Sequence, residues 1–134
     1  MKKNYKKMFI GSILLIAIFT VISSSVFAAP TTDTKQGRVG GCDTTGTLSI
    51  GSTSAIGSTS ISGNTSPADL YVEVSYTYGF GTDRYTVEAS KGTSGSGVGT
   101  SADSKHYGSV SISAKGYHKV VYGGTWSDNT SVRA

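Results

Sequence analysis

The sequence predicts an all-β protein: a small antiparallel β-sandwich or barrel of about six or seven short strands. In several segments from residue 70 onward apolar residues alternate with a period of two, and no window beyond position 28 has the 3.6-residue period of a helix. The alternating segments are rich in Val, Ile, Thr and Tyr, and glycine-containing turns separate them. The length of 134 residues leaves room for one domain.

Residues 1–28 have the three parts of a secretory signal peptide in the expected order. A lysine-rich segment of Gram-positive style precedes an apolar run from Met8 to Ile22, and the small-residue stretch SSSVFA ends at Ala28. The run is shorter than the roughly 20 residues that a membrane-spanning helix needs. We therefore expect a signal helix that is cleaved near Ala28, secretion into the extracellular space, and membrane contact only through the signal peptide.

The charge of the chain is concentrated in this leader. The formal net charge is +4, with 12 cationic and 8 acidic residues. Four of the lysines lie in residues 2–7, so the rest of the chain carries eight cations against eight acidic residues. A nucleic-acid binder needs a surplus of cations to displace counterions from phosphates. The balanced charge therefore predicts no nucleic-acid partner.

Residues 29–45, APTTDTKQGRVGGCDTT, contain no apolar periodicity and predict a flexible N-terminal arm before a β-rich domain at 46–134. The single cysteine, Cys42, cannot pair within its own chain. It can stay unpaired, be buried as a small hydrophobic residue, or form an intermolecular disulfide, which an oxidising exterior permits.

The segment that follows contains a short repeat. The motif Ile-Gly-Ser-Thr-Ser begins at Ile50 and again at Ile56. An even spacing places both isoleucines on the same face of an extended strand. Two copies are too few for a solenoid, so we expect weak strands or a Ser/Thr-rich loop.

The clearest element is residues 70–78, LYVEVSYTY, which alternate over their whole length. The turn sequence GFGTD follows, and residues 84–90, RYTVEAS, alternate again. Glycine supplies positive φ and aspartate bonds nearby amides in such turns. This pair of segments predicts an antiparallel hairpin.

The remainder predicts a loop and three strands. Residues 91–105, KGTSGSGVGTSADSK, indicate a long mobile Gly/Ser loop. Strands are expected at 106–114 and 117–122, separated by a turn at Lys115-Gly116. A short final strand at 125–132 carries Trp126.

No pattern in the chain indicates catalysis. There is no nucleophile elbow, and no metal-ligand or calcium-loop spacing. His106 and His118 are predicted to be surface histidines, with metal ligation as the less favoured alternative. We expect no enzyme activity, no cofactor and no metal site.

Aromatic side chains are the strongest candidates for binding. Tyrosine joins an apolar ring to a polar tip, so exposed rings can stack on sugars or anchor a protein interface. Five residues form the tentative aromatic surface: Tyr71, Tyr107, Tyr117, Tyr122 and Trp126. The alternative is that these rings complete a core that is poor in Leu and Ile.

Three features near the C-terminal end carry a resemblance to a known family. They are Lys105-His106, the alternation from Ser109 to Ala114, and Gly124-Thr125-Trp126. The layout resembles small exported Gram-positive proteins, including the lactococcin-972-type bacteriocins, and implies a β-stranded antagonistic protein. No functional residue is transferred from that family.

Two functions are consistent with these observations. The favoured one is a secreted non-enzymatic β-rich module that binds a surface partner, such as a cell-surface or cell-wall component, or that joins an extracellular assembly by self-association. The alternative is a secreted bacteriocin-like antagonistic protein of the lactococcin-972 type.

Overall fold

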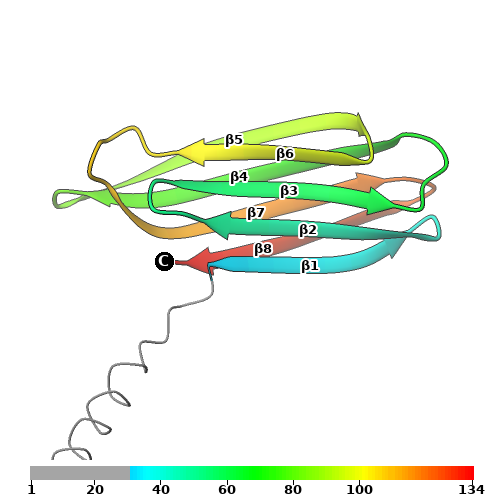
Figure 1. Ribbon diagram of the computed structural model, residues 1–134, viewed down its shortest axis with the longest axis horizontal. Coiled ribbons are helices and arrows are strands. Elements are labelled where there is room, and N and C mark those ends of the chain that lie inside the picture. The colour runs from blue at the N-terminus through cyan, green and yellow to red at the C-terminus, as the bar shows by residue number, and fades with distance from the viewer. Residues whose placement is uncertain (1–30) are drawn as a thin grey trace, which may run out of the picture.

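A computed structural model of the protein describes residues 31–134, which form eight β-strands in two four-stranded antiparallel sheets (Figure 1). The strands are β1 (Thr32–Val39), β2 (Cys42–Ile50), β3 (Ser54–Ser62), β4 (Ala68–Phe80), β5 (Asp83–Gly95), β6 (Gly97–Asp103), β7 (Val110–Val121) and β8 (Thr125–Arg133). The all-β prediction is confirmed, with eight strands instead of six or seven. The predicted signal peptide lies outside the described residues.

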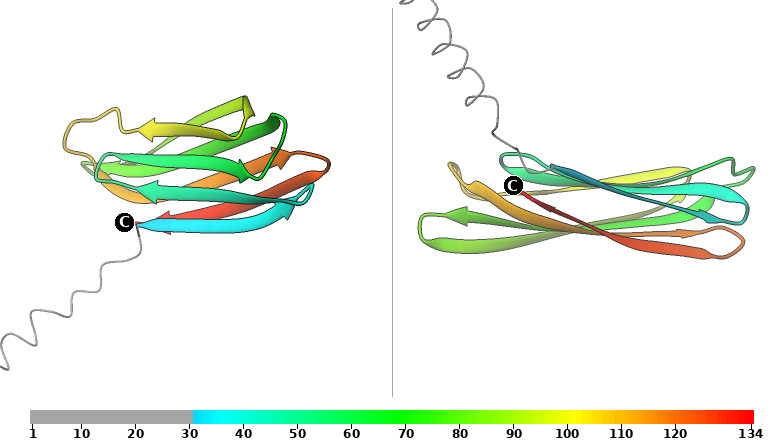
Figure 2. Two further views of the ribbon diagram at one scale, coloured as in Figure 1. Left: turned by 45° about the vertical axis from the view of Figure 1, so that its right-hand side comes forward. Right: turned by 90° about the horizontal axis from the view of Figure 1, so that it is seen from below.

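The first sheet has the strand order β1-β2-β3-β6 and the second has the order β5-β4-β7-β8. The sheets lie face to face, with β1 beside β8 and β5 beside β6 (Figure 2). Three connections, β3–β4, β5–β6 and β6–β7, cross from one sheet to the other. Among residues 31–134, no helix is long and apolar enough to span a bilayer.

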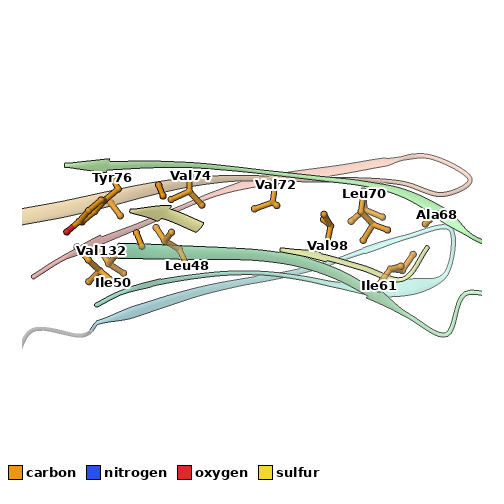
Figure 3. Packing of buried hydrophobic residues seen from close by; sticks show 14 of the residues in the cluster. Leu48, Ile50, Ile61, Ala68, Leu70, Val72, Val74, Tyr76, Val98 and Val132 are labelled. Carbon is orange, nitrogen blue, oxygen red and sulfur yellow. The ribbon is translucent and has the colours of Figure 1, made fainter. Parts of the chain in front are cut away.

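The apolar core fills the space between the sheets (Figure 3). Alternate residues of β4 point inward along its whole length, as the period-two pattern requires. The main members of the core are Leu48, Ile50, Ile61, Leu70, Val72, Val74, Tyr76, Tyr78, Val98, Val120 and Val132. The core is small because several inward positions of β1, β2, β7 and β8 carry glycine or polar side chains.

The predicted central hairpin is confirmed as β4 and β5. The strands pair from Ala68 with Gly95 to Phe80 with Asp83. Gly81 in the turn has a φ of 62°, the left-handed conformation that glycine adopts without strain. The predicted final strand is also confirmed, as β8.

The predicted flexible arm at 29–45 is wrong for the described part of that segment. Residues 32–39 form β1, and β2 begins at Cys42. Gly40 and Gly41 have φ values of 56° and 80°, and positive φ at both central residues is what a two-residue type I′ hairpin turn requires. The strand β1 can be polar because it lies at a sheet edge, where backbone pairing with β2 holds it in place instead of the burial of apolar side chains.

The predicted mobile loop at 91–105 is also corrected. The strand β5 continues to Gly95, and β6 occupies residues 97–103. Val98 and Ala102 point into the core, and backbone pairing with β3 satisfies the rest of the strand. Small inward side chains suffice in this short edge strand, so its composition is that of a loop.

Two local expectations fail for reasons of register. The chain turns between Ile50 and Ile56, so that Ile50 is buried while Ile56 is 53% exposed on the opposite face. The expected turn at Lys115-Gly116 lies inside the continuous strand β7. Gly116 is needed there because a side chain would meet Thr130 and the His118 ring.

Candidate functional site

Tyr71 and Tyr117 come together on the outer face of the second sheet. Their ring centroids lie 6.2 Å apart, with the planes inclined at 59°. A groove of about 470 Å³ extends beside them over β4 and β7. Its lining residues are Asp69, Leu70, Tyr71, Tyr117, Lys119 and Val121. We call this feature the aromatic groove.

Strand alternation and cross-strand register place the two rings. Tyr71 follows the buried Leu70 in β4, so its side chain projects outward. On one side it pairs with Gly92 of β5, which has no side chain to cover the ring. The Tyr71 hydroxyl donates a hydrogen bond of 3.0 Å to Glu73 Oε2, and this bond restrains the ring.

The charges around the groove are balanced. Asp69 and Glu73 lie on β4, while Lys115 and Lys119 lie on the neighbouring strand β7. All four occupy the outer positions of their strands, so donors and acceptors flank the rings without a net field of either sign.

The other three predicted aromatic residues lie elsewhere. Tyr107 is fully exposed in the loop between β6 and β7. The Tyr122 hydroxyl bonds Thr65 across the end of the sandwich, and these hydrogen bonds lower the pKa of Tyr122 below that of an ordinary tyrosine. Trp126 packs against Gly37 between β8 and β1. Only two of the five residues therefore share a surface.

Cys42 is 7% exposed and belongs to the core cluster. This placement corresponds to the expected alternative of a small buried hydrophobic residue. The thiol is free among the described residues. An intermolecular disulfide stays a prediction, and it requires this thiol to become accessible.

The prediction of a surface position is wrong for His118, whose side chain is 0% exposed between the sheets. Its Nδ1 lies 2.9 Å from Thr59 Oγ1 and its Nε2 lies 2.9 Å from Thr130 Oγ1. Thr59 donates its only hydroxyl proton to the Tyr71 carbonyl oxygen, at 3.1 Å. It must therefore accept from His118, which assigns the proton of the neutral ring to Nδ1. Thr130 then donates to Nε2.

Burial of the ring lowers the pKa of His118 below the ordinary histidine value. A hydrogen bond to the Ser58 backbone and the carboxylates of Asp128 and Asp33 offset this effect only in part. Gly46 lies directly against the ring, where any side chain would collide with it. No strand was predicted through Gly46, so no signal in the sequence indicated this close approach.

His106 lies apart from His118, in the loop before β7, where its Nδ1 is 3.0 Å from the Tyr78 hydroxyl. The two histidines thus do not share a site. Within residues 31–134 no three His, Cys, Asp or Glu side chains gather in a way that could hold a metal ion.

A second hollow, of about 440 Å³, lies over β1 and β2. It contains the Arg38–Asp43 ion pair, whose Nε–Oδ1 distance is 3.1 Å, and both side chains are largely exposed. No aromatic ring lines it. The aromatic groove is therefore the better candidate for recognition.

Comparison with protein-family models and with curated proteins finds no match. The resemblance to the lactococcin-972-type bacteriocins stays a sequence-based prediction.

Proposed function

We propose that the exported protein is a non-enzymatic module that binds a polysaccharide of the cell wall or cell surface at the aromatic groove. The observation that carries the proposal is the pairing of Tyr71 and Tyr117, with ring centroids 6.2 Å apart, on a sheet face that is otherwise mostly polar. The weakly polar C–H face of a sugar ring packs well against an aromatic ring.

The polar groups around the rings fit a hydroxyl-rich ligand. Asp69 and Lys119 line the groove itself, and Glu73 lies opposite Tyr117 in the neighbouring strand. Sugar hydroxyls both donate and accept hydrogen bonds, so acidic and basic side chains on one face can serve the same glycan. The bond between Tyr71 and Glu73 restrains one ring before binding, which reduces the entropy lost on association.

The balance of charge favours a neutral glycan over a polyanion. Two acidic residues on β4 face two lysines on β7. Strong binding of a nucleic acid or another polyphosphate requires an excess of cations. A neutral sugar chain requires none.

Self-association through the sheet edges is the less favoured alternative. Three edge strands carry charged residues on the side that faces the core: Asp33 and Lys35 in β1, Lys91 in β5 and Asp128 in β8. Inward-pointing charges oppose the addition of a further strand from another chain. This arrangement favours binding through a sheet face.

The test is retention of the chain from Ala29 onward on insoluble peptidoglycan, chitin and cellulose. Tyr71→Ala and Tyr117→Ala should each weaken binding by about tenfold or more, which corresponds to about 1.4 kcal/mol. Tyr107→Ala is the matched control, because it removes an exposed ring outside the groove and should leave binding unchanged.

Both groove substitutions lie on an outer face, so their melting temperatures should stay close to that of the wild type. Failure of the wild type to bind any of these polysaccharides would remove the proposal. Equal binding by the groove variants and the Tyr107 control would also remove it.

A further inference from the structure

Three of the five large hydrophobic side chains that are exposed in residues 31–134 gather at one end of the sandwich. Phe80 is 42% exposed at the turn between β4 and β5, Tyr107 is 102% exposed in the loop before β7, and Val110 is 69% exposed at the start of β7. Figure 1 shows this turn and this loop at the left. We call these three residues the apolar tip.

Ring contacts hold the two segments of the tip together. The His106 ring stacks on Phe80, with centroids 4.7 Å apart and planes 16° apart, and its centroid lies 4.4 Å from that of Tyr85. The Tyr78 hydroxyl accepts a 3.1 Å hydrogen bond from the Lys105 backbone N–H. The loop is thus held at Lys105 and His106, while the Tyr107 side chain is exposed to solvent.

The chain enters the sandwich at this same end. The Thr31 carbonyl accepts a hydrogen bond from the backbone N–H of Ile50, which is the last residue of β2. Ser111, next to the tip residue Val110, bonds the Gly51 carbonyl of the adjoining turn. Figures 1 and 2 show the start of β1 at the end that carries the tip.

This position determines what the tip faces during export. The apolar run Met8–Ile22 is expected to lie in the membrane before cleavage, and fewer than ten residues separate it from Thr32. Before cleavage, we therefore expect the end of the sandwich at which the chain enters to lie next to the membrane. The residues in and directly next to the turn and the loop include two cations, Arg84 and Lys105, and two acids, Asp83 and Asp103, so the tip has no net charge.

We propose that the apolar tip contacts the outer surface of a lipid bilayer. The Phe80 and Tyr107 rings and the Val110 side chain enter the interfacial region, where aromatic rings are favoured. Because the charges next to the tip are balanced, burial of the apolar side chains carries the contact. This contact goes beyond the expectation that only the signal peptide meets the membrane, and it is separate from the aromatic groove, because Tyr71 lies about 30 Å away along β4.

The experiment measures cosedimentation of the chain from Ala29 onward with vesicles of phosphatidylglycerol and phosphatidylcholine, and with vesicles of phosphatidylcholine alone. The wild type should bind both kinds of vesicle, and added salt should change this binding little, because apolar side chains carry the contact. The triple variant F80S/Y107S/V110S should lose at least about tenfold in partitioning. Ile56→Ser, which removes an exposed isoleucine from a sheet face, should retain wild-type binding.

Phe80 stacks on His106, so the triple variant loses packing as well as exposed apolar surface. Tyr107→Ser alone removes a fully exposed ring, and a wild-type melting temperature would show that this variant is folded. It should weaken binding by a smaller factor than the triple variant. Absence of wild-type binding to vesicles, or wild-type binding by the triple variant, would overturn the proposal. Capture of a soluble protein by the tip in place of vesicles would also overturn it. Loss of polysaccharide binding in Tyr71→Ala with vesicle binding intact would show that the two sites are distinct.

Discussion

Lowering the pH from 7 to 5.5 should lower the free energy of unfolding by about 1.3 kcal/mol through His118, in the limit where the folded ring stays neutral. The ring is 0% exposed, and Thr130 Oγ1 already donates its proton to Nε2. A second ring proton would need an acceptor there, so Thr130 would have to rotate its hydroxyl. Protonation is therefore disfavoured in the folded state.

The sign of the effect follows from the lowered pKa of His118. Above the ordinary histidine pKa of about 6.5, the ring is neutral in both states and the full stability is present. Below that value the unfolded chain gains a proton that the folded protein does not bind. Stability is therefore lost toward acid, with a limiting slope of about 1.4 kcal/mol per pH unit. The nearby carboxylates of Asp128 and Asp33 favour the protonated ring and oppose this trend.

Urea titrations followed by Trp126 fluorescence, at several pH values from 5.5 to 7.5, measure this dependence. His118→Gln should cost stability at every pH and should abolish most of the slope. His106→Gln is the matched control, since it removes the other histidine and should keep the slope. Nitrogen chemical shifts of the imidazole should show the proton on Nδ1 at pH 7. A flat stability profile in the wild type, or an unchanged slope in His118→Gln, would refute the reasoning.

Three substitutions and one chemical probe test the packing and the sheet edge. Gly46→Ala should lower the free energy of unfolding by about 1–3 kcal/mol, because its methyl group meets the His118 ring. Gly97→Ala enters open space and should cost less than about 1 kcal/mol, so equal losses in urea titrations would contradict the packing argument. Asp33→Ala should lower the free energy of unfolding by about 1 kcal/mol, because it removes the acceptor of the Ser131 backbone N–H on β8. It should also promote association, measured by light scattering, because it removes an inward-pointing charge from the edge strand β1. Unchanged scattering at high concentration would contradict this. The Cys42 thiol should react with a maleimide only as fast as the protein unfolds, and immediate labelling of the native protein would contradict its burial.

The hairpin of β4 and β5 could be predicted because its inward positions are apolar and its outward positions are polar. The pattern Leu70, Val72, Val74, Tyr76 and Tyr78 records the buried face directly. The strands β1 and β6 could not be recognised in this way. As edge strands they bury little apolar surface, and backbone pairing maintains them. The Gly40-Gly41 pair was the available signal for the first hairpin.

The aromatic groove was predictable only as a set of candidate residues. Alternation placed Tyr71 on the outer face, but its proximity to Tyr117 depends on the register between β4 and β7. These residues are distant in sequence, and the sequence contains no local indication of that register. The burial of His118 was missed for a similar reason, because its partners Thr59 and Thr130 come from two other strands.

The start of β1 lies beside the C-terminus, and this adjacency has a practical consequence. The backbone N–H of Ser131 bonds Asp33, and the C-terminus emerges beside the start of β1 (Figure 1). An affinity tag or a fluorescent fusion at the C-terminus or directly before β1 will therefore sit at the same end of the sandwich as Phe80 and Tyr107 and can obstruct them sterically. Immobilisation through such a tag will leave Tyr71 accessible, so biosensor studies of glycans and of vesicles require opposite labelling strategies. A short peptide linker between the ends would allow circular permutation with new termini at the distal Gly40-Gly41 turn.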